Sequence, residues 1–260
     1  MTFTIIGTGN IAWFIGNRLV AARHHCNGVF GRNDVQVKKL AEALLCNKHG
    51  NLAAARDTEA DVCFIAVSDD AIAEVVSKLS YQKTVLVHTA GAISLDILKN
   101  ASADAAVLWP VYSIAASSIP QHRNIPMAWE ASSAKAEKYA LSLAHALTDV
   151  LFEAKYEQRR WLHLSAVISN NFVNHLMAIS ERICQENNIP FSALLPVIDQ
   201  TFARFRQASP SVVQTGPAIR GDHETITEQT SLLSTHPEWQ AVYQAITNSI
   251  IHTHASKDVA

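Results

Sequence analysis

Cysteine and long apolar runs are scarce in this chain, and each shortage excludes a class of protein. The four cysteines are scattered without the spacing of metal ligands, so we expect neither a disulfide framework nor a bound metal. No uninterrupted apolar stretch approaches the roughly 20 residues that cross a bilayer. The first apolar strand begins directly after Met1 and leaves no room for a signal peptide. These features predict a cytoplasmic protein with no membrane partner.

An excess of either charge is also missing. The chain carries 21 Lys and Arg against 23 Asp and Glu, a formal net charge of −2, which gives no reason to expect nucleic acid as a partner. It contains no Gly-x-Ser-x-Gly elbow, no Walker-type loop and no His-Glu-x-x-His helix. With 48% hydrophobic residues, 260 residues can bury a sizeable core in one large or two modest domains.

Glycine is rare but concentrated at the start, where five of the nine glycines fall in the first 31 residues. A short apolar run leads into a Gly-x-Gly-x-x-Ala pattern over residues 7–12. The second glycine of such a turn lets the backbone approach a pyrophosphate, and the small residue lets the next helix pack closely on the strand. The N–H groups that open this helix then face the anion. The pattern predicts a dinucleotide site formed by Gly7, Thr8, Gly9, Asn10 and Ile11.

A second strand is predicted over residues 28–33, and its end bears on the choice of cofactor. NAD-selective sites carry an acidic residue there, whereas this chain has Arg32 and Asn33, with Asp34 only later. A guanidinium pairs well with the 2′-phosphate of NADP. Alternatively, Arg32 is a solvated loop residue. We therefore expect Arg32 and Asn33 to bind the cofactor, and NADP to be preferred over NAD.

Short apolar runs alternate with helical periodicity through the first part of the chain. The further strands are expected at residues 60–70, 85–91, 106–110, 125–128 and 150–152. This alternation predicts an α/β fold with a Rossmann-like, doubly wound and largely parallel sheet. Ligands of such sheets bind beyond the carboxyl ends of the strands. The residues placed there are Val67, Ser68, His88 and Thr89 for the cofactor, and Trp109 for the substrate.

The character of the sequence changes near Phe152, where the strand signals end. Helical periodicity follows over residues 161–186, 191–207, 223–233 and 238–252. We therefore expect a dinucleotide-binding domain over residues 1–153 and an all-helical domain over residues 154–260.

Several of these motifs together resemble a known group of proteins. They are the turn at 7–12 and the segments 29–33, 87–92 and 214–222, of which Thr-Gly-Pro-x-x-Arg-Gly-Asp at 215–222 is the most specific. The chain resembles two-domain proteins provisionally named NADP oxidoreductases, which join a Rossmann-like domain to a helical domain of uncharacterised function. It is more distantly similar to pyrroline-5-carboxylate reductases, deazaflavin-dependent NADP reductases and β-hydroxyacid dehydrogenases. The resemblance implies a fold and a cofactor class, and it names no substrate.

One departure from the β-hydroxyacid dehydrogenases concerns their catalytic lysine. Those enzymes carry a Lys-x-x-x-Asn pair on the first long helix of the second domain. Here Ala166 and Val167 stand four residues before Asn170 and Asn171, so the lysine is absent. We do not expect the β-hydroxyacid mechanism.

Polar residues of the long predicted helix offer a different chemistry. His163, Asn170 and Asn174 follow one another at spacings of seven and four, which places all three on one helical face with Val167 between them. We predict that they are catalytic, with the amides donating to a substrate carbonyl and His163 supplying a proton. Alternatively, they satisfy buried backbone groups or cap a dimer contact. Arg220 and Asp222 could bind an anionic substrate group or form a salt bridge that stabilises the turn.

These observations predict an NADP-dependent oxidoreductase that transfers hydride between the nicotinamide and a small carbonyl or imine substrate at the interdomain crevice. The alternative is a dinucleotide-binding protein without catalysis, such as a redox sensor or an assembly partner. We also expect a homodimer formed through the helical domain, because four helices with so many aliphatic residues cover one another only in part. The relatives implied by the resemblance also pair through this domain.

Overall fold

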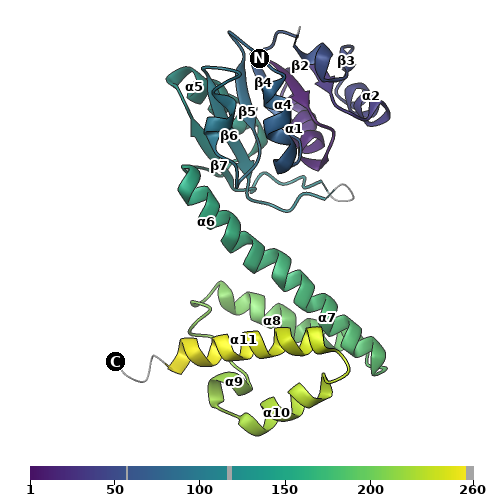
Figure 1. Ribbon diagram of the computed structural model, residues 1–260, viewed down its shortest axis with the longest axis vertical. Helices are drawn as coiled ribbons and strands as arrows, with labels where there is room; N and C mark the ends of the chain where they lie inside the picture. The colour runs from purple at the N-terminus through teal and green to yellow at the C-terminus, as the bar shows by residue number, and fades with distance from the viewer. Residues whose placement is uncertain (57, 116–118, 256–260) are drawn as a thin grey trace. The chain divides into compact units, whose positions relative to one another are not determined.

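The computed structural model describes residues 1–56, 58–115 and 119–255, and the chain divides into two compact units, Met1–Asn170 and Asn171–Ala260 (Figure 1). The predicted boundary at residues 153–154 lies where the last strand ends. The first unit nevertheless extends beyond this point, because the helix that follows packs side chains such as Leu162 against the core of the sheet.

An eight-stranded sheet forms the centre of the first unit. Its strands are β1 (Thr2–Ile6), β2 (His25–Phe30), β3 (His49–Gly50), β4 (Val62–Ile65), β5 (Val85–His88), β6 (Ala105–Pro110), β7 (Met127–Ala131) and β8 (Leu151–Glu153). They lie in the order β3-β2-β1-β4-β5-β6-β7-β8, and only the pairing of β6 with β7 is antiparallel. The predicted Rossmann-like, largely parallel fold is confirmed. The order of the strands reverses between β1 and β4, which is where such sheets bind ligands.

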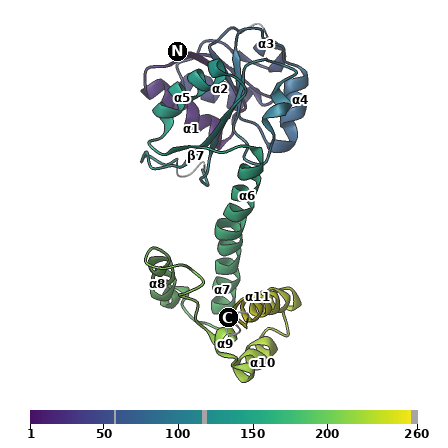
Figure 2. The ribbon, with the colours of Figure 1, turned by 90° about the vertical axis from the view of Figure 1, so that its left-hand side faces the viewer.

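Helices cover both faces of this sheet, because alternate residues of each buried strand point to opposite sides. Phe64 packs into the core beneath α1 (Asn10–Ala21), α2 (Asp34–Ala43) and α5 (Ala134–Leu147). Its neighbour Ile65 packs into the core beneath α3 (Leu52–Ala55), α4 (Ile72–Ser77) and η2 (Leu95–Leu98). The short helix η1 (Asp69–Ala71) directly precedes α4. Figure 2 shows α1, α2 and α5 on one side of the sheet and α3 and α4 on the other.

The long helix predicted over residues 161–186 contains an irregular turn. It consists of α6 (Tyr156–Ala166), a π-helical segment η3 (Val167–Phe172) and α7 (Val173–Glu186). A π-helix bonds residue i to i+5 and so holds more residues per turn than the roughly 3.6 of an α-helix. The expectation that His163 shares one helical face with Asn170 and Asn174 stays a prediction, because the π-helical segment spans the boundary between the two units.

The second unit is helical throughout its described regular elements. After α7 it contains η4 (Phe191–Leu194), α8 (Leu195–Phe205), α9 (Pro217–Arg220), α10 (His223–Leu232) and α11 (Pro237–Ala255). The helices α9, α10 and α11 pack against one another (Figure 1). Among residues 171–254, only Cys184 and Thr247 are buried. No helix within the described ranges combines the length and the apolar character needed to cross a bilayer.

Candidate functional site

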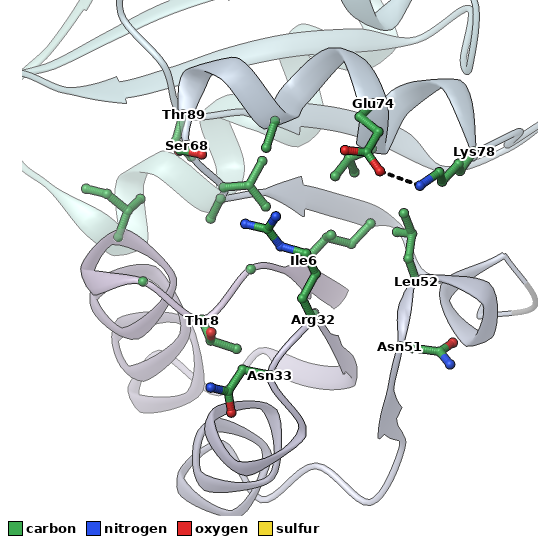
Figure 3. Close-up of a pocket in the computed structure, with 18 of the residues that line it drawn as sticks. Ile6, Thr8, Arg32, Asn33, Asn51, Leu52, Ser68, Glu74, Lys78 and Thr89 are labelled. Carbon is green, nitrogen blue, oxygen red and sulfur yellow. Dashed lines mark hydrogen bonds and ion pairs between the residues drawn. The ribbon is translucent and has the colours of Figure 1, made fainter.

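A cavity of about 870 Å³ opens at the carboxyl ends of β1, β2 and β4, where the order of the strands reverses. Its volume lies within the range of small-molecule and cofactor sites. The predicted cofactor residues that line it are Gly7, Thr8, Gly9, Asn10, Ile11, Arg32, Asn33, Val67, Ser68 and Thr89 (Figure 3). His88 is the one predicted cofactor residue that does not line the cavity.

The two glycines of the first turn are required for different reasons. Gly7 has a φ of +117°, and a Cβ at this position would lie 2.1 Å from the carbonyl oxygen of Ala66. Its N–H donates to the carbonyl of Phe30 at 2.8 Å, so Gly7 joins three strand ends. Gly9 has an ordinary φ of −77°, and a Cβ there would meet nothing within 4 Å. Gly9 therefore leaves open space beside the start of α1.

The start of α1 is suited to an anion. Gly9 is the N-cap residue and offers no side chain to cap the helix, and the first turn contains no acidic residue. The first N–H groups of a helix have no partner within the helix, and the helix dipole favours negative charge at this end. The open space at Gly9 and these exposed donors fit a pyrophosphate.

The end of β2 contributes a cation to the same cavity. Arg32 is exposed and lines the cavity, and no acidic residue stands beside it at the end of the strand (Figure 3). Asn33 is the N-cap of α2, and its side chain accepts from the N–H of Gln36 at 3.1 Å. The cavity thus holds a guanidinium where NAD-selective sites hold a carboxylate.

Two acidic side chains lie near Arg32: Glu74 on α4, which lines the cavity, and Asp70 on η1, which does not. The Ser68 hydroxyl and, more weakly, the charge of Arg32 hold the pKa of Asp70 below its ordinary value. Lys78 and, again more weakly, Arg32 do the same for the pKa of Glu74. Both carboxylates therefore remain charged at neutral pH, and Glu74 with Lys78 gives this side of the cavity a mixed electrostatic surface.

Several lining residues were missed by the sequence analysis. They are Asn51, Leu52 and Ala53 at the start of α3, Ala71, Glu74, Val75 and Lys78 at α4, and Ile114. The strand β3 has two residues and α3 has four, which is too short for a periodic signal. Glu74 on α4 forms an ion pair with Lys78, which caps this helix. Their spacing of four residues was the one feature of the sequence that indicated an exposed helix there.

His88 is fully buried at the end of β5 and stabilises the turn that follows. Its Nδ1 accepts from the N–H of Ala90 at 3.2 Å. Burial and the nearby charge of Arg159 lower the pKa of His88 to about 3, so the imidazole is neutral at physiological pH. The structure gives His88 a place behind the cavity wall rather than in the cavity.

Arg159, near the start of α6, is the buried charge beside this turn. Its side chain is completely buried, pairs with Glu130 on β7 and donates to the carbonyls of Ala154 at 3.0 Å and Ile93 at 2.8 Å. A single guanidinium therefore joins β7, the segment after β8 and the segment after β5. Thr89, which lines the cavity, begins the segment after β5. Arg159 binds the carbonyl of Ile93, further along the same segment.

Two of the predicted substrate and catalytic residues lie together. The rings of Trp109, at the end of β6, and His163, on α6, have centroids 5.8 Å apart and planes inclined by 55°. Trp109 also covers Gly91, where a Cβ would lie 2.4 Å from the indole. His163 is half-buried, so part of its imidazole is open to solvent.

The other predicted residues are placed differently. Asn170 is an exposed residue at the end of the first unit, and Asn174 is exposed in the second. Arg220 lies 3.9 Å from Asp222 in the second unit, as the turn-stabilising alternative requires. Asp222 also caps α10 by accepting from the N–H of Thr225 at 3.1 Å, a bond that lowers the pKa of Asp222. Within the described part of the chain, no three His, Cys, Asp or Glu side chains gather as metal ligands would.

Comparison with known proteins agrees with this geometry. Residues 2–91 match the family described as NADP oxidoreductase coenzyme F420-dependent, and residues 125–250 match a domain of unknown function, DUF2520. The chain therefore carries an oxidoreductase-type, nucleotide-binding Rossmann domain followed by a DUF2520 domain, and the resemblance seen in the sequence is confirmed. The family match indicates a nicotinamide dinucleotide as the cofactor. Among curated proteins, none matches this chain.

Solved structures of similar fold span nearly the whole chain. A Bacteroides fragilis protein named a "putative NADP oxidoreductase" is 28% identical over 96% of this chain and 98% of its own, with a TM-score of 0.87. A Streptomyces aurantiacus imine reductase is 10% identical over 99% and 95% of the two chains, with a TM-score of 0.67. A Coxiella burnetii pyrroline-5-carboxylate reductase is 16% identical over 98% and 97%, with a TM-score of 0.52. The last two likenesses concern the fold alone.

Proposed function

We propose that this protein is an NADP-dependent oxidoreductase that acts on a small carbonyl or imine compound. The observation that carries the proposal is the cavity at the β1 and β4 strand ends, with the open position at Gly9 at one side and Arg32 at another. In this proposal the backbone of residues 9–11 binds the pyrophosphate, and Arg32 pairs with the 2′-phosphate. The bound cofactor supplies or accepts the hydride, and the protein binds and orients both reactants.

Trp109 and His163 are the side chains that we assign to the substrate. An indole packs against the apolar part of a small substrate, and an imidazole is the commonest general acid or base of enzymes. His163 is in contact with Trp109 and still partly open to solvent, as a proton donor to a developing alkoxide or amine must be. The amide of Asn170 is a further candidate donor in the first unit.

Absorbance measurements of NADPH oxidation against small oxo acids and cyclic imines, run beside a binding measurement, test this function. Turnover of a member of either class supports the proposal. The second candidate is a dinucleotide-binding protein without catalysis, which is favoured by Ala166 and Val167 at the positions of the dehydrogenase lysine. NADPH binding without turnover of any compound would support that candidate, and failure to bind would contradict both.

The first prediction concerns the choice of cofactor. At equal concentration, NADPH is expected to raise the melting temperature more than NADH, because Arg32 pairs with the additional phosphate. A ligand at about a hundred times its dissociation constant adds roughly 2.7 kcal/mol to the free energy of unfolding. The Arg32→Asp variant should reduce or reverse the preference in thermal melts. The control is Arg23→Asp, at an exposed turn that does not line the cavity. Equal shifts by the two cofactors on the wild-type protein would refute the prediction.

The second prediction concerns His163. Once a substrate is known, His163→Ala should lower kcat while leaving NADPH affinity nearly unchanged, because general acid catalysis contributes about a hundredfold to ten-thousandfold in rate. The matched control is His175→Ala, an exposed histidine of α7. Steady-state kinetics and a cofactor titration measure the two effects separately. An unchanged kcat would return His163 to a structural role.

We also propose that the chain forms a homodimer through its helical unit. With only Cys184 and Thr247 buried among residues 171–254, this unit lacks a core of its own. Large apolar side chains are instead exposed, including Ile189, Leu195, Val197, Phe202, Phe205, Val212 and Leu232. Exposed apolar side chains in this number favour an interface, and twofold pairing is its commonest closed form.

The third prediction tests this pairing by sedimentation equilibrium at micromolar concentration. The wild-type protein should have twice the mass of one 28.4 kDa chain. Phe202→Glu should shift the equilibrium toward the monomer, because it places a charge in an apolar interface. The control is Leu45→Glu, at a side chain of the first unit that is 79% exposed. A wild-type mass of one chain that does not depend on concentration would contradict the proposal.

A further inference from the structure

Two cysteines that are distant in sequence lie side by side in the first unit. Cys26 is on β2 and Cys46 follows the end of α2, and both side chains are buried in the same core, 3% and 6% exposed. Each thiol shifts the pKa of the other, so the two side chains are neighbours. Both are free thiols, and neither takes part in the proposed cofactor site.

The backbone fixes each of these thiols. The pairing of β1 with β2 shifts by one residue directly after Cys26, so that Phe3 faces Cys26 while Thr4 faces Gly28. Such a bulge changes the direction of the side chains beside it. The Cys26 thiol also contacts the carbonyl of Gly28, with 3.7 Å between sulfur and oxygen.

Cys46 is positioned by the end of α2. The helix closes through Leu45, which has a left-handed φ of +53°, and the N–H of Cys46 donates to the carbonyl of Ala41 at 2.8 Å. The carbonyl of Lys48 accepts from the N–H of Val29 at 3.1 Å and from the Cys46 thiol at 3.2 Å. This shared acceptor holds the segment after α2 alongside β2, where Val29 lies opposite His49 and each cysteine stands three residues before that pair.

The environment makes the two thiols chemically unequal. The neighbouring Cys26 thiol lowers the pKa of Cys46 to about 7, against the opposing effect of burial. The neighbouring Cys46 and burial raise the pKa of Cys26. Burial also raises the pKa of Cys63 to about 11, and Cys184 lies in the second unit. Thiolates are the reactive form, so Cys46 is the nucleophile and Cys26 the thiol beside it.

We propose that Cys26 and Cys46 form a redox-active dithiol, which a hydroperoxide such as hydrogen peroxide oxidises to an intramolecular disulfide. The Cys46 thiolate attacks one peroxide oxygen, the O–O bond breaks, and the departing hydroxide takes a proton to leave as water. The resulting sulfenic acid is then attacked by the sulfur of Cys26, which loses its proton. The S–O bond breaks and a second water leaves. Two thiols are thereby oxidised by two electrons and one peroxide is reduced to two waters.

The disulfide would enclose a functional segment of the chain. Residues 27–45 contain Arg32, Asn33 and the whole of α2, so the cross-link would join the two ends of the segment that forms one wall of the cavity. The redox chemistry of the pair does not depend on the proposed enzymatic activity, and its test needs no substrate.

Peptide mapping of the intact protein tests the proposal. The folded protein is treated with hydrogen peroxide, its remaining thiols are alkylated in denaturant, and the protein is digested without reductant. We expect the four thiols to fall to two, with Cys26 joined to Cys46 within one chain, and dithiothreitol to restore all four. Retention of four thiols, or loss at Cys63 or Cys184 in place of this pair, would overturn the proposal.

Variants identify the order of the steps. In Cys26→Ser the sulfenic acid of Cys46 has no partner, so a dimedone adduct is expected at Cys46. In Cys46→Ser, Cys26 should remain reduced, and the matched control Cys63→Ser should oxidise as the wild-type protein does. A dimedone adduct on Cys26 in the Cys46→Ser protein would contradict the assigned roles. If a variant fails to fold, the mapping of the wild-type protein still decides whether the disulfide forms.

Discussion

Gly9→Ala is expected to lower the affinity for NADPH at least about a hundredfold, about 2.7 kcal/mol of binding free energy, while leaving the melting temperature within a few degrees of wild type. The backbone of Gly9 has a φ of −77°, which alanine adopts freely, and the added methyl group meets no protein atom within 4 Å. The methyl group instead enters the space that we assign to the pyrophosphate, which the backbone must approach closely.

Gly7→Ala is the matched comparison for this variant. A Cβ at Gly7 would lie 2.1 Å from the Ala66 carbonyl, on a backbone with a φ of +117°. Steric overlap and a disfavoured φ each cost roughly 1–3 kcal/mol, so this variant should melt well below the wild-type protein. Isothermal titration with NADPH and thermal melts of both variants separate binding from folding. Wild-type NADPH affinity in Gly9→Ala would show that the pyrophosphate lies elsewhere.

Arg159→Met should lower the free energy of unfolding by about 3–5 kcal/mol, which is the effect of removing one partner from a buried ion pair. Arg159 is wholly buried, whereas the Glu130 side chain is 18% exposed and would keep a largely uncompensated charge. The carbonyls of Ile93 and Ala154 would also lose a donor. For a chain of this size the melting temperature should fall on the order of 10 °C.

The adjacent arginine supplies the control for this prediction. Arg160 pairs with Glu157 on the exposed side of the same helix, three residues away. Exposed pairs of this kind contribute at most about 1 kcal/mol, so Arg160→Met should melt close to the wild-type protein. Denaturant titrations of the two variants give the difference in free energy directly. Equal stability of the two variants would contradict the structural role of Arg159.

The parts of the site that were predictable from sequence are those fixed by local backbone chemistry. The turn at Gly7 and Gly9 and the strand ends at Ser68 and Thr89 follow from residue order alone. A parallel sheet brings the carboxyl ends of its strands to one edge, whatever the helices between them do. Arg32 lines the cavity for the same reason, because it follows directly on the end of β2.

The parts that were not predictable depend on side-chain direction and on contacts between distant segments. His88 also ends a strand, yet it is buried beside Arg159, whose partners come from β7 and from the segments after β5 and β8. The π-helical turn at residues 167–172 has no periodic signature, so the sequence predicted one continuous helix there. The pairing of Cys26 with Cys46 likewise arises from the bulge in β2 and the end of α2.

A crystal structure of the protein grown with NADPH tests the central claim most directly. We expect the pyrophosphate to contact the backbone of residues 9–11 and Arg32 to contact the 2′-phosphate. A dinucleotide bound away from the glycine turn, or a cavity that stays empty at saturating NADPH, would contradict it.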